Sequence, residues 1–447
     1  MFSNFKNKLS KSITKNELTI KKIENLTTQN GIIEPLYDTE LFVSQFIPKN
    51  DFDLFYFNNA SLLNNTIKLE VYEYFDINTN SLKNRLFAVN KSFELYEYQF
   101  DSKSFISCYV TFSKFPKIIH HDGLIYFIDN QTSIMFENDN APIVLTTLAN
   151  LQHFALCENK IIFSTKDAPF EIFYTELTPL YNIHSSLENC YSLTLAPEDG
   201  KVLNITILNE KIYIVQEHKI SKITIKNNEA ILSTTLQINA KILINTAKNC
   251  NNYIIFCTKD ALFAFNGNSC NRLFDEIFQN INFENPESVV FENKYYLKAN
   301  DELLIEFDIE KEVYNLFKLN GIQNIYTMQS ASFYNLCLTK FDELNYSILA
   351  LHDNKLTSKN KQIVFNKISF DTNDFKVLKE IKFIGVGECD VSVKSDIESL
   401  SFHLTANTKM SNITICGNVF ELIFEGVANF LIEAIFVKIL NSSDEYE

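Results

Sequence analysis

Few residue groupings in the sequence could support chemistry, and the first is a pair of adjacent histidines, His120 and His121. Histidine nitrogens bind metal ions such as zinc. Neighbouring side chains on a β-strand point to opposite faces, so this pair is poorly placed to hold one ion. An Asp-Gly dipeptide follows at 122–123 and marks a turn. We therefore expect the two histidines to flank a turn and not to bind a metal.

Residues 76–81, Asp-Ile-Asn-Thr-Asn-Ser, begin like a calcium-binding loop. In an EF-hand loop the sixth position is glycine and the twelfth is glutamate, but here these positions hold Ser81 and Phe87. Residues 136–142, Phe-Glu-Asn-Asp-Asn-Ala-Pro, also offer oxygen ligands, but they fit a solvated turn before the proline. Neither segment is predicted to bind calcium.

The sequence lacks the motifs of serine hydrolases, zinc peptidases, P-loop proteins and dinucleotide-binding proteins. The two glycines of GVGECDV at 385–391 lack the strand–helix context of a phosphate loop and predict a β-bulge. The 55 Asp and Glu residues leave a glycosidase carboxylate pair open by number, but no position is distinguished. The sequence thus predicts no catalytic residue, no cofactor-binding residue, no metal ligand and no enzyme.

The nine cysteines show no spacing typical of a zinc site or a disulfide framework, because their number is odd and no Cys-x-x-Cys pair occurs. They are Cys108, Cys157, Cys190, Cys250, Cys257, Cys270, Cys337, Cys389 and Cys416. This pattern predicts reduced thiols in a protein made in a cytoplasm. The basic N-terminus has no apolar stretch typical of a signal peptide, and no run of about 18 apolar residues indicates a membrane span.

The formal net charge of −15 and the isoelectric point of about 5.1 bear on possible partners. Tight binding of nucleic acid needs clustered Lys and Arg that replace counterions, so a DNA-binding role is disfavoured. An acidic surface suits a protein that DNA passes without sticking.

One decapeptide occurs almost twice: IIFSTKDAPF at 161–170 and IIFCTKDALF at 254–263 share eight of ten residues. Similar apolar strands between short polar turns recur along the chain at intervals of 38, 37, 51, 42, 41 and 41 residues. Their central residues are Phe87, Ile125, Ile162, Tyr213, Ile255, Tyr296 and Cys337. A period near 40 residues in such strands is typical of β-propeller blades. We predict an all-β fold with a β-propeller of six or seven blades, seven being favoured, over residues 46–375.

Beyond residue 375 the pattern changes to six compact apolar strands, at 377–387, 390–395, 399–405, 412–417, 419–426 and 431–439. They predict a small antiparallel β-sandwich over residues 376–447. Alternation of apolar and polar residues places five side chains in its core. These are Leu400, Phe402, Leu404, Ile413 and Ile415.

The first 45 residues match neither pattern and are locally basic, with six lysines against Glu17 in residues 1–22. Two interpretations stay open for this N-terminal arm: a frayed terminus, or a segment that docks on the acidic body of a neighbouring subunit.

Residues 158–177, 199–223 and 249–273, together with the apolar strands of the C-terminal domain, resemble the β-propeller proteins of bacteriophage virions. These include the tail hub, nozzle and packaged-DNA-stabilising proteins of short-tailed phages. The sequence departs from the family pattern at Ala261, where glycine is common, and in having no tryptophan.

The resemblance implies a structural component of a phage tail or neck, located in the virion and in the host cytoplasm during assembly. It implies a cyclic homo-oligomeric ring, with six-fold symmetry expected, around a channel through which DNA leaves. The expected partners are further copies of the chain and portal, adaptor or other tail proteins, without membrane contact or cofactors.

Two alternatives stay open. A propeller hydrolase acting on glycans would need two or three acidic or tyrosine residues at one end of the central channel. A propeller adaptor that binds a protein partner would need an exposed apolar or basic groove.

Overall fold

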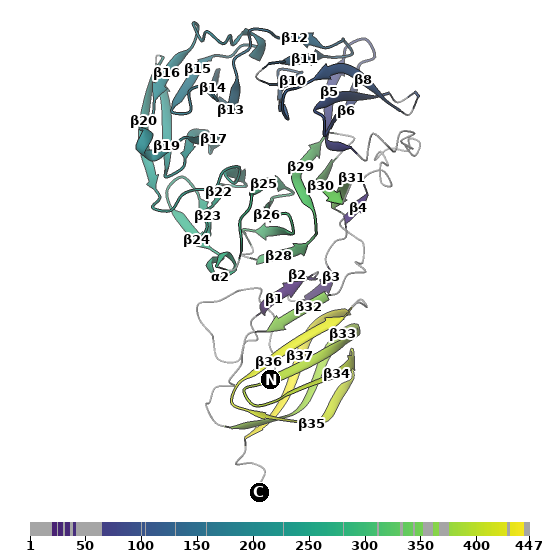
Figure 1. Cartoon of the computed structure of the whole chain (residues 1–447). Coiled ribbons are helices and arrows are strands. Elements are labelled where there is room, and N and C mark those ends of the chain that lie inside the picture. The colour runs from purple at the N-terminus through teal and green to yellow at the C-terminus, as the bar shows by residue number, and fades with distance from the viewer. Residues whose placement is uncertain are drawn as a thin grey trace. The chain divides into compact units, whose positions relative to one another are not determined.

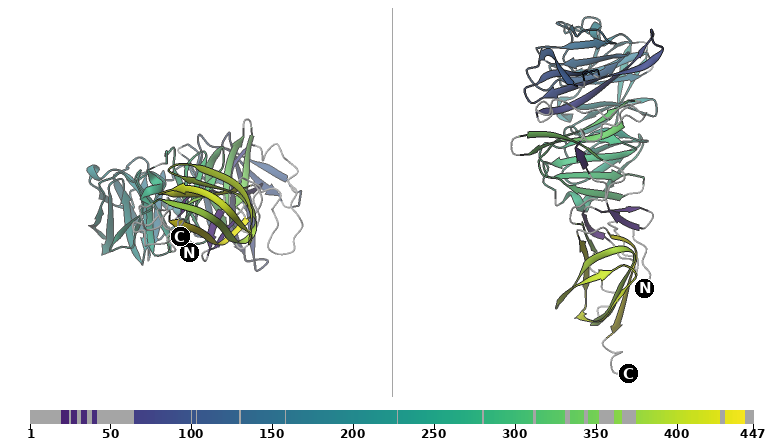
Figure 2. Two further views of the ribbon diagram at one scale, coloured as in Figure 1. Left: turned by 90° about the horizontal axis from the view of Figure 1, so that it is seen from below. Right: turned by 90° about the vertical axis from the view of Figure 1, so that its right-hand side faces the viewer.

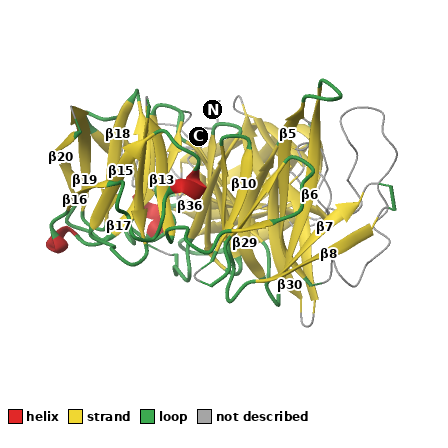
Figure 3. Ribbon diagram, turned by 90° about the horizontal axis from the view of Figure 1, so that it is seen from above, coloured by secondary structure: helices red, strands yellow, loops and turns green. Residues whose placement is uncertain are grey.

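The structure, a computed structural model, describes residues 20–24, 26–29, 32–35, 39–41 and 65–441. In the last range, residues 100, 103, 130, 158, 227, 280, 311–312, 331–333, 343–344, 352–360, 366–374 and 427–429 are outside the description. The protein is all-β, and helix in the described part is confined to α2 (Asp275–Phe278) and the 3-10 turns Leu180–Asn182 and Pro197–Asp199 (Figure 3). No helix there is long and apolar enough to cross a membrane.

The chain forms two compact units. The larger comprises residues 40–302 and 320–351, and the smaller comprises residues 1–39, 303–319 and 352–447. Each unit is described below by the sheets that its strands form.

Seven four-stranded antiparallel sheets follow one another along the described chain. The first contains β5 (Thr66–Asp76), β6 (Ser81–Asn90), β7 (Glu94–Gln99) and β8 (Ser104–Thr111). The second contains β9 (Lys117–His121), β10 (Leu124–Ile128), β11 (Ile134–Glu137) and β12 (Ile143–Val144). The third contains β13 (Leu151–Cys157), β14 (Lys160–Thr165), β15 (Glu171–Glu176) and β16 (Tyr191–Thr194). The fourth contains β17 (Val202–Leu208), β18 (Lys211–Gln216), β19 (Lys219–Lys226) and β20 (Glu229–Gln237).

The remaining three sheets have the same strand order. The fifth contains β21 (Lys248–Cys250), β22 (Tyr253–Cys257), β23 (Leu262–Phe265) and β24 (Cys270–Leu273). The sixth contains β25 (Glu287–Phe291), β26 (Lys294–Asn300), β27 (Leu303–Asp308) and β28 (Val313–Lys318). The seventh contains β29 (Ile322–Gln329), β30 (Tyr334–Asp342) and β31 (Asn345–Leu351), and its fourth strand is β4 (Thr39–Leu41) from the N-terminal segment.

The repeat found in the sequence corresponds to one strand of each sheet. Its seven central residues lie on β6, β10, β14, β18, β22, β26 and β30, the second strand in every case. None of these seven side chains is more than 2% exposed. The two similar decapeptides begin on β14 and β22, two sheets apart, and Lys166 and Lys259 lie in the exposed turns that follow. The predicted repeat of buried strands and polar turns is therefore confirmed.

Neighbouring sheets pack face to face through apolar side chains. Phe87 of the first sheet contacts Phe127 and Phe136 of the second at ring-centroid distances of 5.5 and 4.6 Å. Similar buried layers join the second to the third sheet, the third to the fourth and the fourth to the fifth. The first sheet also packs against the seventh, since Leu86 and Cys337 belong to one buried group. The sheets thus form a propeller-like arrangement around a common centre (Figures 1 and 2).

The smaller unit contains a nine-stranded antiparallel sheet that takes strands from both ends of the chain. Its strands are β1 (Ile20–Glu24), β2 (Leu26–Gln29), β3 (Ile32–Pro35), β32 (Lys361–Phe365), β33 (Lys376–Ser395), β34 (Ser399–Thr405), β35 (Lys409–Gly417), β36 (Phe420–Gly426) and β37 (Phe430–Asn441). The described part of the predicted N-terminal arm therefore lies in β-strands, and β32, predicted within the propeller, belongs to this sheet. Residues 1–19 lie outside the described residues.

Two strands predicted at 377–387 and 390–395 are one continuous strand, β33, so this part of the sequence prediction is wrong. The first part of β33 pairs with β35 and its last part with β34 and β36. The predicted bulge is present, because the register against β37 shifts between Ile384 and Gly385. Gly387 has a φ of 87°, a conformation that glycine adopts without a steric cost. The glycines bend the strand without ending it.

The predicted core of this unit is confirmed at three positions and wrong at one. Leu404, Ile413 and Ile415 are at most 3% exposed, and Phe402 is half-buried against the same core. Leu400 is 40% exposed. Leu400, Phe402 and Leu404 share one face of β34, a strand whose described pairing is with β33. Burial on this face increases toward the C-terminal end of β34, which is why alternation alone overestimated the core.

Candidate functional site

The first strands of six of the seven sheets form a chain of contacts in the larger unit, and the second sheet contacts β5 through β10. Contacts join β13 to β17, β17 to β21, β21 to β25, β25 to β29 and β29 to β5. Figure 1 shows β13, β17 and β29 on the inner side of the circle of sheets. We call these first strands the inner strands. Because they meet around one centre, polar residues on different inner strands can face the same space.

Four lysines lie on or next to the inner strands, and we call them the inner lysines. They are Lys68 on β5, Lys117 on β9, Lys201 immediately before β17, and Lys248 on β21. Each lies within the first three residues of its inner strand or directly precedes it. They come from the first, second, fourth and fifth sheets, so only a shared central space can bring their charges together.

The pKa values of Lys117 and Lys248 are lowered by the protein around them. The side chain of Lys117 is exposed to solvent, yet the protein around it lowers its pKa to about 8. The main cause is loss of hydration, followed by the positive charges of Lys248 and Lys68. Burial likewise lowers the pKa of Lys248, with the charge of Glu287 acting in the opposite direction. The protein around both lysines therefore limits the hydration of their charged forms.

His153 on β13 faces the same group. Its pKa is lowered to about 3, first by burial and then by the charges of Lys117, Lys248 and Lys201. The imidazole is consequently neutral at neutral pH. As a neutral ring it offers one hydrogen-bond donor and one acceptor to this space.

Two acidic residues partly balance the inner lysines. Glu70 on β5 lies 2.9 Å from Lys68 Nζ and 2.8 Å from His120 Nε2. Burial works to raise the pKa of Glu70, but Lys68 and His120 together hold it below its usual value. Glu287 Oε2 accepts a hydrogen bond from the Ile325 backbone N–H at 3.1 Å.

The balance leaves positive charge in excess. The four inner lysines carry two more positive charges than Glu70 and Glu287 can offset, because His153 is neutral. Lys117, Lys201 and Lys248 have no hydrogen bond or ion pair with any group in the described part of the chain. In a protein with a net charge of −15, this is an unusual local composition.

The histidine pair singled out from the sequence is divided between two environments. His120 points to Glu70, whereas His121 is buried with Nε2 3.2 Å from the Thr178 carbonyl oxygen. The two residues end β9 before the turn at Asp122, as predicted. No group of three or more His, Cys, Asp or Glu residues suited to a metal ion occurs among the described residues.

The calcium-like segment is a turn closed by its own side chains. Asp76 lies 2.6 Å from Lys83 Nζ and accepts hydrogen bonds from Thr79 Oγ1 and the Asn78 backbone N–H, both at 2.9 Å. The Lys83 hydrogen bond is the main cause that lowers the pKa of Asp76 to about 2. In the neighbouring 136–142 segment, Asp139 accepts a hydrogen bond from the Tyr74 hydroxyl.

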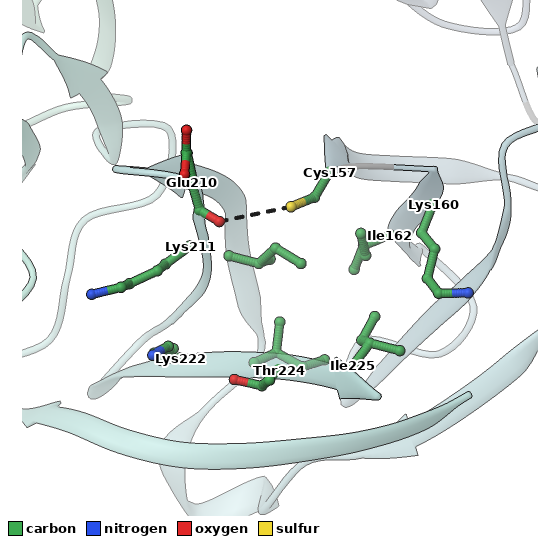
Figure 4. A pocket seen from close by; sticks show the side chains of 10 residues that line it. Cys157, Lys160, Ile162, Glu210, Lys211, Lys222, Thr224 and Ile225 are labelled. Atoms are coloured by element: carbon green, nitrogen blue, oxygen red, sulfur yellow. Dashed lines mark hydrogen bonds between the residues drawn. The ribbon is translucent and has the colours of Figure 1, made fainter. Parts of the chain in front are cut away.

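A separate pocket of about 200 Å³ lies between the third and fourth sheets (Figure 4). Isoleucines, including Ile162 and Ile225, form much of its lining. At its rim Lys160 pairs with Glu176 and Asn228, and the Cys157 thiol lies 3.9 Å from the Glu210 carbonyl oxygen. Lys160 and Cys157 are thus engaged with the protein, whereas Lys211 and Lys222 also line the pocket.

Sequence reasoning missed the inner lysines. A lysine at or just before the start of the strand that precedes four of the seven repeat strands was the available signal. The sequence does not reveal which such strands meet at the centre, so it cannot separate these lysines from the other surface lysines.

Comparison with known proteins gives no family. No family model matches the chain, and no curated protein matches its sequence. Among solved structures, YCF48 bound to D1 peptide is similar with a TM-score of 0.41 and 10% identity, over 70% of this chain and 99% of that chain. The extracellular domain of the hybrid two-component system BT4673 from B. thetaiotaomicron is similar with a TM-score of 0.40 and 11% identity, over 74% of this chain and 43% of that chain. Kluyveromyces lactis Hsv2 is similar with a TM-score of 0.33 and 10% identity, over 53% of this chain and 82% of that chain.

These likenesses are distant. The chain spans less than half the length of the two-component-system domain. At such TM-scores the neighbours carry no argument about the activity or partners of this protein.

Proposed function

We propose that this protein is a structural component of a phage tail or neck, built on a seven-bladed β-propeller with an appended β-sandwich. The proposal combines the sequence resemblance to virion propellers with one structural observation. That observation is the circle of seven sheets, in which the first sheet packs against the last. Each four-stranded sheet is then one blade, and β4 completes the seventh blade from the opposite end of the sequence.

The sandwich is proposed from the core of the smaller unit. Residues from both parts of β33, such as Phe383 and Val393, enter one hydrophobic core together with Leu404. A single long strand that contributes to two faces of one core is expected where a sheet folds over on itself.

A structural role is supported by how the charged groups of the described residues are used. Arg85 and Asp76, for example, bond to groups within the fold. The buried cysteines are poor nucleophiles, since burial raises the pKa of Cys257 to about 12. We therefore propose that the protein is not an enzyme.

In the assembled particle we propose a cyclic homo-oligomer, with six-fold symmetry expected, in contact with portal, adaptor or other tail proteins. Head-to-tail interfaces that close on themselves form such rings. The acidic net charge would let DNA pass through the ring with little adhesion.

Mass spectrometry of purified phage particles, with antibody labelling in electron micrographs, tests this role. We expect the protein among the particle components and the label at the tail or neck. A protein present in infected cells but absent from washed particles would contradict the proposal.

A second candidate, a propeller adaptor that binds a protein partner, is favoured by the inner lysines. This alternative requires an exposed apolar or basic groove, and the excess of lysines at the inner strands supports a basic one. Capture of a defined acidic protein that is lost when Lys117 is replaced would support the adaptor over the virion component.

A further inference from the structure

The hairpin formed by β5 and β6 ends in a turn that exposes three large apolar side chains. Ile77 in the turn is 84% exposed, and Phe75 and Leu82 beside it are 52% and 55% exposed. Phe75 and Leu82 are directly opposite in the strand pairing, so they lie on the same face of the hairpin. We call Phe75, Ile77 and Leu82 the hairpin tip. Turns in water usually carry polar residues, and grouped apolar side chains such as these are typical of a contact surface.

The turn at the hairpin tip is held in shape by its own side chains and carries negative charge. Asp76 accepts hydrogen bonds from Thr79 Oγ1 and the Asn78 backbone N–H, both at 2.9 Å. Lys83 Nζ lies 2.6 Å from Asp76 and 3.7 Å from Asp139, so two carboxylates share one ammonium group. An ordered turn loses little conformational freedom when it binds. The hairpin tip is therefore a preformed apolar surface beside an excess of negative charge.

The pocket between the third and fourth sheets has the size and lining to receive an apolar side chain. Four isoleucines line it: Ile162, Ile212, Ile223 and Ile225. Its volume of about 200 Å³ exceeds the roughly 150 Å³ of an apolar cavity that holds a benzene molecule. A branched aliphatic side chain is smaller than benzene with its contact shell, so it fits this pocket.

The charges that line this pocket are mainly positive. Lys160, Lys211 and Lys222 line it together with one acidic residue, Glu210. Lys160 pairs with Glu176, whereas Lys211 and Lys222 form no ion pair with any residue in the described part of the chain. Figure 4 shows Lys160 and Lys211 at opposite margins of the space between the isoleucines. The margin thus suits an acidic apolar segment.

We propose that the hairpin tip of one chain inserts into this pocket of a second copy of the chain, with Ile77 as the buried side chain. The apolar parts match, and the acidic turn meets the lysines of the pocket. Within one chain the second sheet separates the tip from the pocket, because the first sheet packs on the second and the second on the third. The contact joins two different surfaces head to tail, and such contacts form rings when they close. The proposal rests on the ring proposed above and names its interface.

Disulfide crosslinking of the full chain tests the contact, because the native Cys157 lines the pocket. A disulfide requires Cα atoms within about 7 Å. Under a mild oxidant, Ile77→Cys should give covalent dimers and longer species on a non-reducing gel, and adding Cys157→Ser should abolish them. Ile397→Cys is the matched control, since Ile397 is 59% exposed but belongs to the smaller unit. It should give no crosslink that depends on Cys157.

Sedimentation of the full chain over a range of concentrations measures the same contact without a crosslink. Ile77→Asp should weaken self-association by at least about tenfold, because it places a charge where an interface anchor is buried. Ile397→Asp, the matched control, should leave self-association within about threefold of the parent. Both positions are exposed in the single chain, so both variants should keep the melting temperature of the parent.

The outcomes separate the contact from the ring. Self-association of the parent without a Cys157-dependent crosslink, or equal effects of Ile77→Asp and Ile397→Asp, would overturn the contact and leave the ring standing. Open fibres that carry the crosslink would support the contact and contradict the ring. A parent chain that does not self-associate at any concentration would contradict both.

Discussion

At the residue scale, Arg85 shows how a buried cation can serve the fold. Its Nε and Nη2 each lie 2.7 Å from a carboxylate oxygen of Glu97, and Nη1 donates to the Asn138 carbonyl at 2.7 Å. The guanidinium also lies 4.7 Å from the ring centroid of Phe136. Arg85 therefore joins the first sheet to the second, unlike Lys117, Lys201 and Lys248, which have no such partner among the described residues.

Replacement of this buried pair should be costly. We expect Arg85→Ala to lower the free energy of unfolding by about 3–5 kcal/mol, because it leaves the Glu97 carboxylate without its partner. Arg272→Ala is the control, since Arg272 is 52% exposed in its pair with Asp275 and should cost below about 1 kcal/mol. Denaturant unfolding measures both. Equal losses would show that Arg85 does not join the sheets.

The neutral state of His153 predicts a pH dependence of stability. Its pKa is about 3 in the folded protein, below the ordinary value of 6.5, so the unfolded chain binds the proton more readily. Stability is therefore retained above pH 6.5 and is lost as the pH falls toward 3. Between pH 6.5 and 5 this residue should account for about 1–2 kcal/mol of the loss.

His153→Gln should melt with a shallower pH dependence than the parent in this acidic range. His403→Gln is the matched control, because hydrogen bonds from its ring N–H groups to the carboxylates of Asp390 and Glu388 raise the pKa of His403. Its contribution is present at acidic pH and lost as the pH rises, so this replacement should have the opposite sign. An unchanged profile for His153→Gln would place its ring outside the charged group.

At the element scale, the sequence predicts strands well where local pattern decides and poorly where distant segments meet. All seven repeat strands were found, because a run such as Ile-Ile-Phe between polar turns is readable from neighbours alone. The pairing of β4 with the seventh sheet and of β1 with β32 was not found. These strands are three to five residues long and pair with segments about 300 residues away, so no local pattern reveals them.

The burial gradient along β34 gives a graded prediction. Leu404→Ala should cost about 2–5 kcal/mol, since the side chain is fully buried. Leu400→Ala should cost less than about 1 kcal/mol, and Phe402→Ala should fall between the two. Unfolding of the smaller unit, followed in the full chain, measures the series. A cost for Leu400→Ala equal to that for Leu404→Ala would contradict the description of β34.

At the scale of the whole molecule, the N-terminal segment contributes strands to both units. Deletion of residues 1–41 removes β4 together with β1, β2 and β3 of the smaller unit, and leaves the seventh sheet with three strands and an open edge at β31. We expect this deletion to lower the melting temperature and to promote aggregation, as unpaired edge strands do. Deletion of residues 1–19 is the control and should leave the melting temperature unchanged. If both deletions behave alike, β4 does not close the propeller.

The candidate site also depends on how the whole chain folds. The sequence gives each inner lysine as one lysine among many, and only closure of the circle brings the first, second, fourth and fifth sheets to one centre. The chemistry at that centre could not be predicted from residue spacing, because the lysines are separated by 47 to 84 positions along the chain.

Cryo-electron microscopy of intact phage particles that carry the protein tests the central claim of a virion propeller most directly. We expect a ring of identical subunits at the tail or neck, six-fold in symmetry, with a seven-bladed propeller fitting each subunit. Particles whose tail and neck contain no propeller-shaped density, or that carry the protein only as isolated copies without a ring, would contradict it.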